Sequence, residues 1–356
     1  MADRGRRALT AATTAAGVAA GYFGEREAFR GRMQIVRHGP ELGDFAGESR
    51  EIEAPDATRI FVETYGPDDP DAPQVVFVHG YTMSGRCWHE QVVALRHRYR
   101  LITYDQPGHG RSSPPRSGTF TIELLGDALG AVIEQATDHT RGPLVVVGHS
   151  MGGMTALACA RRHGDLFRAR VGGLVLLSTT AKSGAEDVAM GLGVQLLARA
   201  ERAITAVAGV LGERVREVAR IYRASSDLSF VLVRAVALCR GADPRYVDFT
   251  EQLVLDTDLR TASQLLPVLA RMDEDHTLAT LDVPTLVVVG ARDRMTPVDH
   301  ARHMAEVNPD VDVVELPGIG HMTPLEAHHV VNALVVHMVG AVHSPAPSAE
   351  VATSRT

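Results

Sequence analysis

One short stretch limits what this chain can fold into more than any other. The apolar, largely β-branched run at residues 144–147 predicts a strand buried on both faces, and residues 154–162 have the composition of a helix. The two are joined by Gly148-His149-Ser150-Met151-Gly152. Glycines on both sides of a serine lack Cβ atoms, so a strand and a helix can approach closely at a very sharp turn. We therefore expect a strand, a strained turn at Ser150 and a helix.

A Gly-x-Ser-x-Gly pattern between a strand and a helix is the signature of a serine nucleophile held on a sharp elbow. The Ser150 hydroxyl would stand exposed above the carboxyl end of the sheet. The N–H group of Met151 would lie at the helix start, where donors are unpaired and negative charge is favoured. The alternative is an ordinary glycine-rich turn with a capping serine. The choice depends on whether the rest of the chain supplies a base.

Strands and helices alternate along much of the remaining chain. Strands are expected at residues 49–54, 58–65, 75–78, 100–104, 172–178, 283–290 and 311–316, and helices at 88–96, 121–135, 297–307 and 324–339. Strands that alternate with helices of about 10–15 residues imply a parallel sheet. The first two strands alternate polar and apolar residues, so we expect them to pair antiparallel at one edge. The fold class is therefore α/β with a mostly parallel sheet.

The alternation stops between two strands of the sheet. Residues 181–278 show helical runs at 188–211, 213–224, 229–239, 244–255 and 260–272, and we interpret them as a helical insertion. The chain then divides into an extension (1–45), a core (46–180 and 279–342), this insertion, and a tail (343–356). The tail is rich in alanine, proline and serine, so we expect it to be disordered.

Two further residues follow strands directly and complete a pattern with the serine. Asp293 follows the strand at 283–290, and His321 follows the strand at 311–316. Loops at the carboxyl ends of strands are where α/β sheets place their ligands. We expect Nε2 of His321 to take the Ser150 proton, while the Asp293 carboxylate holds Nδ1–H and stabilises the imidazolium. Taken alone, Asp293 could be a turn or capping carboxylate, and His321 a loop residue.

The backbone N–H groups of Tyr81 and Met151 are the expected donors to a developing oxyanion. Gly80 would let the backbone approach that oxyanion, although a tight turn explains this glycine nearly as well. We expect His79 to be a hydrogen-bond partner behind the site rather than a base. The residues expected to support the serine turn are Gly148, His149 and Gly152.

The N-terminal residues differ in composition from the rest. Arg4, Arg6 and Arg7 precede a run of alanine, threonine and glycine at residues 8–23. This segment is an export signal, a membrane-associating helix through residues 1–25, or an extension that stays on the mature chain. A membrane span needs about 20 strongly apolar residues, and this run is shorter and too rich in alanine. We favour the extension and a cytoplasmic location, with export or membrane association as alternatives.

Charge and composition narrow the range of partners. The net charge is −7 and there is no basic run, which argues against a nucleic-acid partner. The three cysteines are widely spaced and predict neither a disulfide framework nor a zinc site. The sixteen histidines include no His-Glu-x-x-His pattern. We expect no metal and no cofactor, and the oligomeric state stays open.

The motifs resemble those of the α/β-hydrolase fold family over residues 50–180 and 280–340. They are His79-Gly80, Asp105-x-x-Gly108-His109-Gly110-Arg111-Ser112, Gly148 to Gly153, Gly290-x-x-Asp293 and Gly320-His321. The resemblance implies helices on both faces of the sheet, and a cap at residues 181–278, inserted before the strand that bears the acid. Serine at position 150 indicates the esterase and lipase-like branch, since epoxide hydrolases and haloalkane dehalogenases of this family carry aspartate there. His328 departs from the pattern, because relatives often have proline at that place.

We expect a serine hydrolase that cleaves a carboxylic ester with an apolar or medium-chain acyl group through an acyl-enzyme. The apolar side chains at 188–211 would form a wall for that group, unless this helix only packs on the core. The same triad also serves carbon–carbon bond hydrolases, thioesterases, perhydrolases and acyltransferases, which stay open as alternatives. Outside enzymes, the alternatives are a catalytically silent binding protein of the same fold and a membrane-tethered scaffold.

Overall fold

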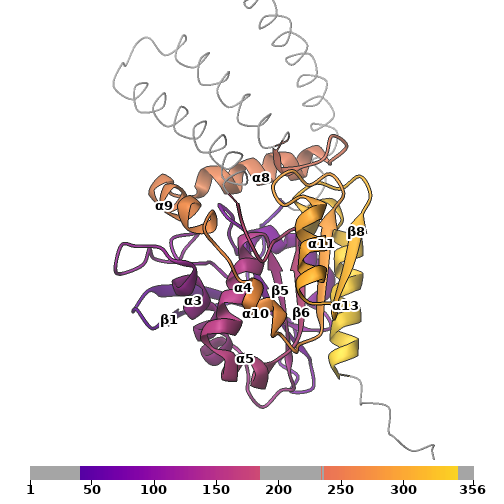
Figure 1. The fold of residues 1–356 in the computed structure, drawn as a ribbon. Coiled ribbons are helices and arrows are strands. Elements are labelled where there is room, and N and C mark those ends of the chain that lie inside the picture. Colours follow the sequence, from indigo (N-terminus) through magenta and orange to yellow (C-terminus); the bar gives the residue numbers. More distant parts are fainter. Residues whose placement is uncertain (1–40, 185–233, 235, 344–356) are drawn as a thin grey trace, which may run out of the picture. The chain divides into compact units, whose positions relative to one another are not determined.

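The structure, a computed structural model, describes residues 41–184, 234 and 236–343 (Figure 1). Outside the described residues lie most of the extension, the expected helices at 188–211 and 213–224, most of 229–239, and nearly all of the tail. No helix among the described residues is long and apolar enough to cross a membrane.

Eight strands form one sheet in the order β1-β2-β4-β3-β5-β6-β7-β8. Their bounds are Glu48–Glu53 (β1), Arg59–Tyr65 (β2), Gln74–Val78 (β3), Arg100–Tyr104 (β4), Leu144–His149 (β5), Val171–Leu177 (β6), Thr285–Gly290 (β7) and Val311–Leu316 (β8). β2 pairs antiparallel with β1 and with β4, and every other pair of neighbours is parallel. The structure confirms the α/β fold class with a mostly parallel sheet.

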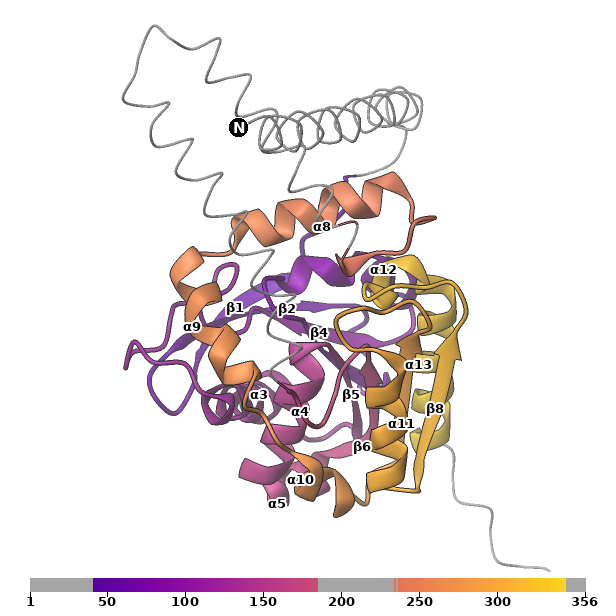
Figure 2. The same cartoon turned by 45° about the horizontal axis from the view of Figure 1, so that its top comes forward.

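Helices cover both faces of this sheet (Figures 1 and 2). Their bounds are His89–Leu95 (α2), Ile122–Ala136 (α3), Met151–Arg162 (α4), Val298–Val307 (α11) and His328–His343 (α13). Side chains of α3, α4 and α11 share one apolar cluster with alternate strand residues such as Val146 and Leu174. The next residue back in β6, Gly173, faces Met338 of α13 instead, and α13 also contacts α2. The central strands are therefore apolar on both faces because both faces are covered.

Several helices differ from the sequence prediction. α8 (Pro244–Asp256) and α9 (Leu259–Leu269) lie near the expected positions, but α5 (Gly164–Arg170) and α10 (Asp275–Ala279) were not predicted. The prediction of a single closing helix at 324–339 is wrong, because α12 (Thr323–Glu326) and α13 are separated at Ala327. The φ of Ala327 is −124°, and the His328 ring donates from Nδ1 to the Leu325 carbonyl at 2.9 Å across this break. A side-chain bond to the carbonyl competes with the helical ladder there.

The helices α8 and α9 of the insertion contact α2 and the loop after β3, respectively (Figure 2). From α8, the Tyr246 hydroxyl donates to Glu90 Oε1 at 2.8 Å. In the other direction, the Tyr81 hydroxyl donates to the Ala262 carbonyl of α9 at 2.8 Å. α8 and α9 are thus each tied to the core by a buried or half-buried tyrosine hydroxyl.

Candidate active site

Ser150 occupies the turn between β5 and α4, in a backbone conformation that is unfavourable for a residue with a side chain. Its φ is 52° and its ψ is −121°, which costs on the order of 1–3 kcal/mol and persists only where the surroundings hold it. Here the Ser150 N–H donates to the Leu177 carbonyl at 2.9 Å, and the Thr179 hydroxyl donates to the Ser150 carbonyl at 2.7 Å. The turn is therefore fixed from both sides by the end of β6 and the residues after it.

The glycines around Ser150 mark very close backbone approaches. A Cβ atom at Gly152 would lie 2.0 Å from the Val78 carbonyl oxygen of β3, far inside contact distance. A Cβ at Gly148 would lie 2.7 Å from the Gly152 oxygen. Any side chain at these two positions would push α4 away from the sheet, so Ser150 keeps its place only with glycine on both sides.

Asp293 and His321 meet at the carboxyl ends of β7 and β8. The ring nitrogen Nδ1 of His321 lies 2.9 Å from Oδ2 and 3.1 Å from Oδ1 of Asp293. The His321 side chain is 4% exposed and the Asp293 side chain is 0% exposed. Two loops that are 28 positions apart in sequence thus deliver a buried imidazole–carboxylate pair.

The Asp293 carboxylate also accepts hydrogen bonds from its own loop. Oδ1 accepts the N–H groups of Met295 and Thr296, both at 2.9 Å, and Oδ2 accepts the Thr296 hydroxyl at 2.9 Å. Burial works against the charged form, but His321 and these donors hold the pKa of Asp293 below its usual value. Sequence reasoning missed Thr296, although an aspartate three residues before a threonine and a proline is a recognisable turn signal.

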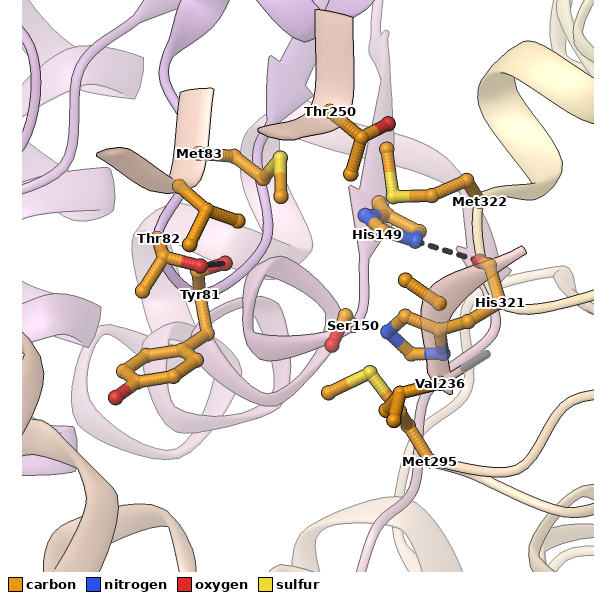
Figure 3. A pocket seen from close by; sticks show the side chains of 12 residues that line it. Tyr81, Thr82, Met83, His149, Ser150, Val236, Thr250, Met295, His321 and Met322 are labelled. Carbon is orange, nitrogen blue, oxygen red and sulfur yellow. Dashed lines mark hydrogen bonds between the residues drawn. The ribbon is translucent and has the colours of Figure 1, made fainter. Parts of the chain in front are cut away.

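Ser150 and His321 border the same cavity. Figure 3 shows the His321 ring beside Ser150, with the nitrogen that Asp293 does not bind on the serine side. Within the described part of the chain, no hydrogen bond joins the Ser150 hydroxyl to this ring. Three methionines, Met83, Met295 and Met322, line the cavity. Imidazole and hydroxyl therefore face a common, largely apolar space.

His79 and Gly80 set the direction of the Tyr81 N–H. The His79 ring accepts the Gln106 N–H at Nε2 (2.8 Å), so its Nδ1 carries the proton and donates to the Gly80 carbonyl at 2.8 Å. Carbonyl 80 and N–H 81 belong to one planar, trans peptide and point in opposite directions. Fixing the carbonyl behind the loop thus turns the N–H of Tyr81 the other way. At the start of α4, the N–H of Met151 is one of the donors that a helix leaves without an intrahelical partner.

His149 is held in a different way from His321 and is not placed as a base. Its Nε2–H donates to the backbone carbonyl of His321 at 2.9 Å, shown as the dashed line in Figure 3. Burial, followed by the nearby His321, lowers the pKa of His149 to about 3. A neutral ring in this position ties the residue before the serine to the histidine loop.

The insertion also holds the His321 loop, which sequence reasoning did not anticipate. The N–H groups of His321 and Met322 both donate to the Ala237 carbonyl at 3.0 Å. Two residues on, the Cys239 N–H donates to Glu326 Oε2 at 2.7 Å. Ala237 lies in a helical stretch and Glu326 ends α12. The two segments are far apart in the sequence, and no local pattern could have paired them.

Among the residues that the structure describes, no group of three or more His, Cys, Asp or Glu side chains could hold a metal ion. The side chains gathered at this edge are a hydroxyl, an imidazole and a carboxylate, with backbone N–H groups beside them. Together these groups are those of nucleophilic acyl chemistry.

Comparison with known proteins agrees with this architecture. The chain is 29% identical over 285 residues to the pimeloyl-[acyl-carrier protein] methyl ester esterase of Chromobacterium violaceum, covering 78% of this chain and 98% of that protein. It is 26% identical over 276 residues to 3-oxoadipate enol-lactonase 2 of Acinetobacter baylyi, covering 74% and 89%. A solved esterase from Thermogutta terrifontis superposes with a TM-score of 0.65 over 84% of this chain and 100% of that chain, at 24% identity.

The family model described as the alpha/beta hydrolase fold matches residues 73–327. This range runs from the start of β3 to the end of α12 and includes Ser150, Asp293 and His321. The chain therefore belongs to the alpha/beta hydrolase fold family and is an enzyme of the hydrolase class.

Proposed function

We propose that this protein hydrolyses carboxylic esters through an acyl-enzyme on Ser150. The observation that carries the proposal is the buried His321–Asp293 pair, whose free ring nitrogen borders the same cavity as a serine on a strained strand-to-helix turn. In this proposal Ser150 is the nucleophile, His321 the base and then the acid, and Asp293 the group that holds the His321 tautomer.

The reaction would proceed in two steps. Nε2 of His321 takes the Ser150 proton as Oγ attacks the ester carbonyl, and the N–H groups of Tyr81 and Met151 stabilise the oxyanion. The proton then passes to the leaving alkoxide, the carbon–oxygen bond breaks, and an acyl-serine remains. In the second step His321 deprotonates water, and the water oxygen attacks the acyl carbon. The bond from that carbon to Oγ then breaks, Oγ takes the proton back from Nε2, and the acid is released. Contacts between a nucleophile and its base are often loose without substrate.

We further propose that residues 181–278 form a cap over this site. Support comes from α8 and α9, whose side chains line the space beside Ser150, and from the bond between Ala237 and the His321 loop. The apolar lining favours small-molecule esters with apolar groups. The two relatives named above as a methyl ester esterase and an enol-lactonase are consistent with ester chemistry.

Two measurements test the proposal. Wild-type protein should react with a fluorophosphonate probe and hydrolyse p-nitrophenyl esters, and Ser150→Ala should do neither while keeping its melting temperature. A matched control is Ser112→Ala, because Ser112 also lies after a strand. Among the described residues its hydroxyl bonds only the Phe61 N–H and the Asp105 carbonyl, so this variant should still be labelled. Equal ester hydrolysis by wild type and Ser150→Ala would refute the proposal. It would also be refuted if the probe did not label wild-type protein, which is the result expected of a catalytically silent binding protein.

A further inference from the structure

Two cavities meet at Ser150. Three residues line both: Tyr81, Ser150 and Met295. The first cavity, drawn in Figure 3, extends to Val236, Ala237, Thr250 and Val254 of the insertion. The second extends to Met154, Thr180, Ser183, Leu266, Leu269 and Ala270. The serine therefore stands between a space under α8 and a space under α9.

The two cavities differ in one chemically decisive residue. His321 lines the first cavity and, of the residues that the structure describes, is not part of the lining of the second. A base that has taken the serine proton must return it to the leaving oxygen, so the leaving group has to lie on the side of the imidazole. The acyl substituent then occupies the other side of the carbonyl carbon.

We propose that the cavity under α9 binds the acyl group of the ester and that the cavity under α8 binds its alcohol group. This assignment rests on the proposed function, because it uses Ser150 as nucleophile and His321 as proton donor. Tyr81 and Met295 are the partition between the two subsites. The Tyr81 ring is fixed by its bond to the Ala262 carbonyl, whereas methionine adapts to different shapes.

The linings also define the class of substrate. The described residues around both cavities include no Asp, Glu, Lys or Arg. A charged group moved from water into such surroundings without a partner pays a large desolvation penalty. The preferred substrate is thus an uncharged ester with an apolar group on each side of the ester bond, and a free carboxylate on either arm is disfavoured.

The assignment is tested by filling each cavity separately. Ala270→Leu adds volume under α9, and Val254→Phe adds volume under α8; both wild-type side chains are half-buried. Two substrate series are compared: p-nitrophenyl esters from acetyl to octanoyl, which vary the acyl arm, and alkyl acetates from methyl to hexyl, which vary the alcohol arm. Ala270→Leu should lower kcat/KM for the long acyl esters by about tenfold relative to the acetyl ester. Val254→Phe should do the same for the long alkyl acetates, and each variant should keep the wild-type preference in the other series.

If a variant with a filled cavity does not fold, two variants with enlarged cavities test the same assignment: Leu266→Ala and Val254→Ala. Leu266→Ala should extend acyl tolerance, and Val254→Ala alcohol tolerance. Exchanged effects, or equal shifts in both series, would overturn the assignment. Fluorophosphonate labelling of every variant separates the two proposals: a labelled protein with exchanged effects contradicts only the subsites, whereas wild type that is neither labelled nor active removes both.

Discussion

The Nδ1 atom of His321 lies 2.9 Å from Oδ2 of Asp293, and both side chains are almost completely shielded from water. Three further donors from the Asp293 loop reach the same carboxylate. In the proposed mechanism the carboxylate is therefore ionised and fixed before the imidazole takes up a proton. A charge placed in this way stabilises an imidazolium far more than it would in bulk water.

Replacing this carboxylate by an amide should abolish most of the activity without unfolding the protein. Asp293→Asn keeps the size of the side chain, but its amide group no longer requires a proton on Nδ1 and cannot stabilise an imidazolium. We expect kcat for p-nitrophenyl acetate to fall by about 1,000- to 10,000-fold. Thr296→Val removes only the hydroxyl that donates to Oδ2 and should cost far less. A loss below tenfold in Asp293→Asn would contradict the role given to the pair.

The contact between the insertion and the histidine loop should influence catalysis through Glu326. Burial, opposed by the Cys239 side chain and by backbone donors, raises the pKa of this carboxyl. Glu326→Ala leaves the Cys239 N–H without its acceptor, which costs about 1–3 kcal/mol, and frees the loop that carries His321. We expect kcat to fall more than KM changes, and Glu326→Gln, which retains an acceptor oxygen, to recover most of the loss. Lower thermal stability with an unchanged kcat in Glu326→Ala would show that Glu326 does not position His321.

Much of the sheet could be predicted because buried strands carry continuous apolar runs. β4 has the predicted bounds, and β5 ends at the residue before Ser150. The edge strand β8 also has the predicted bounds, although its middle residues are half-buried or exposed. The short helices α5 and α10 were missed because they are 7 and 5 residues long and show too few turns for a periodic pattern. The break at Ala327 was missed because a side-chain bond from His328 interrupts an otherwise helical sequence.

In the candidate site, too, some features could be predicted from the sequence and others could not. Asp293 and His321 could be named because each follows a strand directly, and parallel strands bring such loops to one edge. The hydrogen bonds that fix the His321 loop could not be predicted. They join Ala237, Glu326 and the His149 ring to backbone groups that lie far away in the sequence. A sequence shows which loops share an edge, whereas packing decides which backbone groups meet.

The glycine after the serine should be far less replaceable than a glycine elsewhere in a helix. Gly152→Ala places a Cβ 2.0 Å from a backbone oxygen of β3, which only a shift of α4 can relieve. Overpacking of this kind costs about 1–3 kcal/mol or more, and displacement of Ser150 should reduce fluorophosphonate labelling as well. Gly340→Ala in α13 is the matched control, since nothing lies within 4 Å of its added Cβ. It should raise the unfolding free energy by up to about 1 kcal/mol. Equal stability of the two variants in urea would contradict the steric argument.

The buried histidines should make the protein sensitive to mild acid. Burial lowers the pKa of His79 to about 4, and burial with a neighbouring histidine lowers the pKa of His109 and of His149 to about 3, from an ordinary value of 6.5. Between these values the unfolded chain binds protons that the folded chain does not. The free energy of unfolding thus has its full value above pH 6.5 and falls as the pH is lowered toward 4. Each such histidine lowers it by about 1.4 kcal/mol per pH unit well inside that range.

His109 is the histidine with which to test this acid sensitivity, because its ring bonds only the Pro107 carbonyl among the described residues and it lies outside the proposed triad. The histidines with a lowered pKa are His79, His89, His109 and His149. His109→Gln removes one of the protons that they take up on unfolding, so urea unfolding from pH 7.5 to 4.5 should show a slope of stability against pH that is smaller by about a quarter to a third. His97→Gln changes an exposed histidine and should leave the slope as in wild type. An unchanged slope in His109→Gln would mean that this ring is already protonated in the folded protein, contrary to its complete burial beside His79.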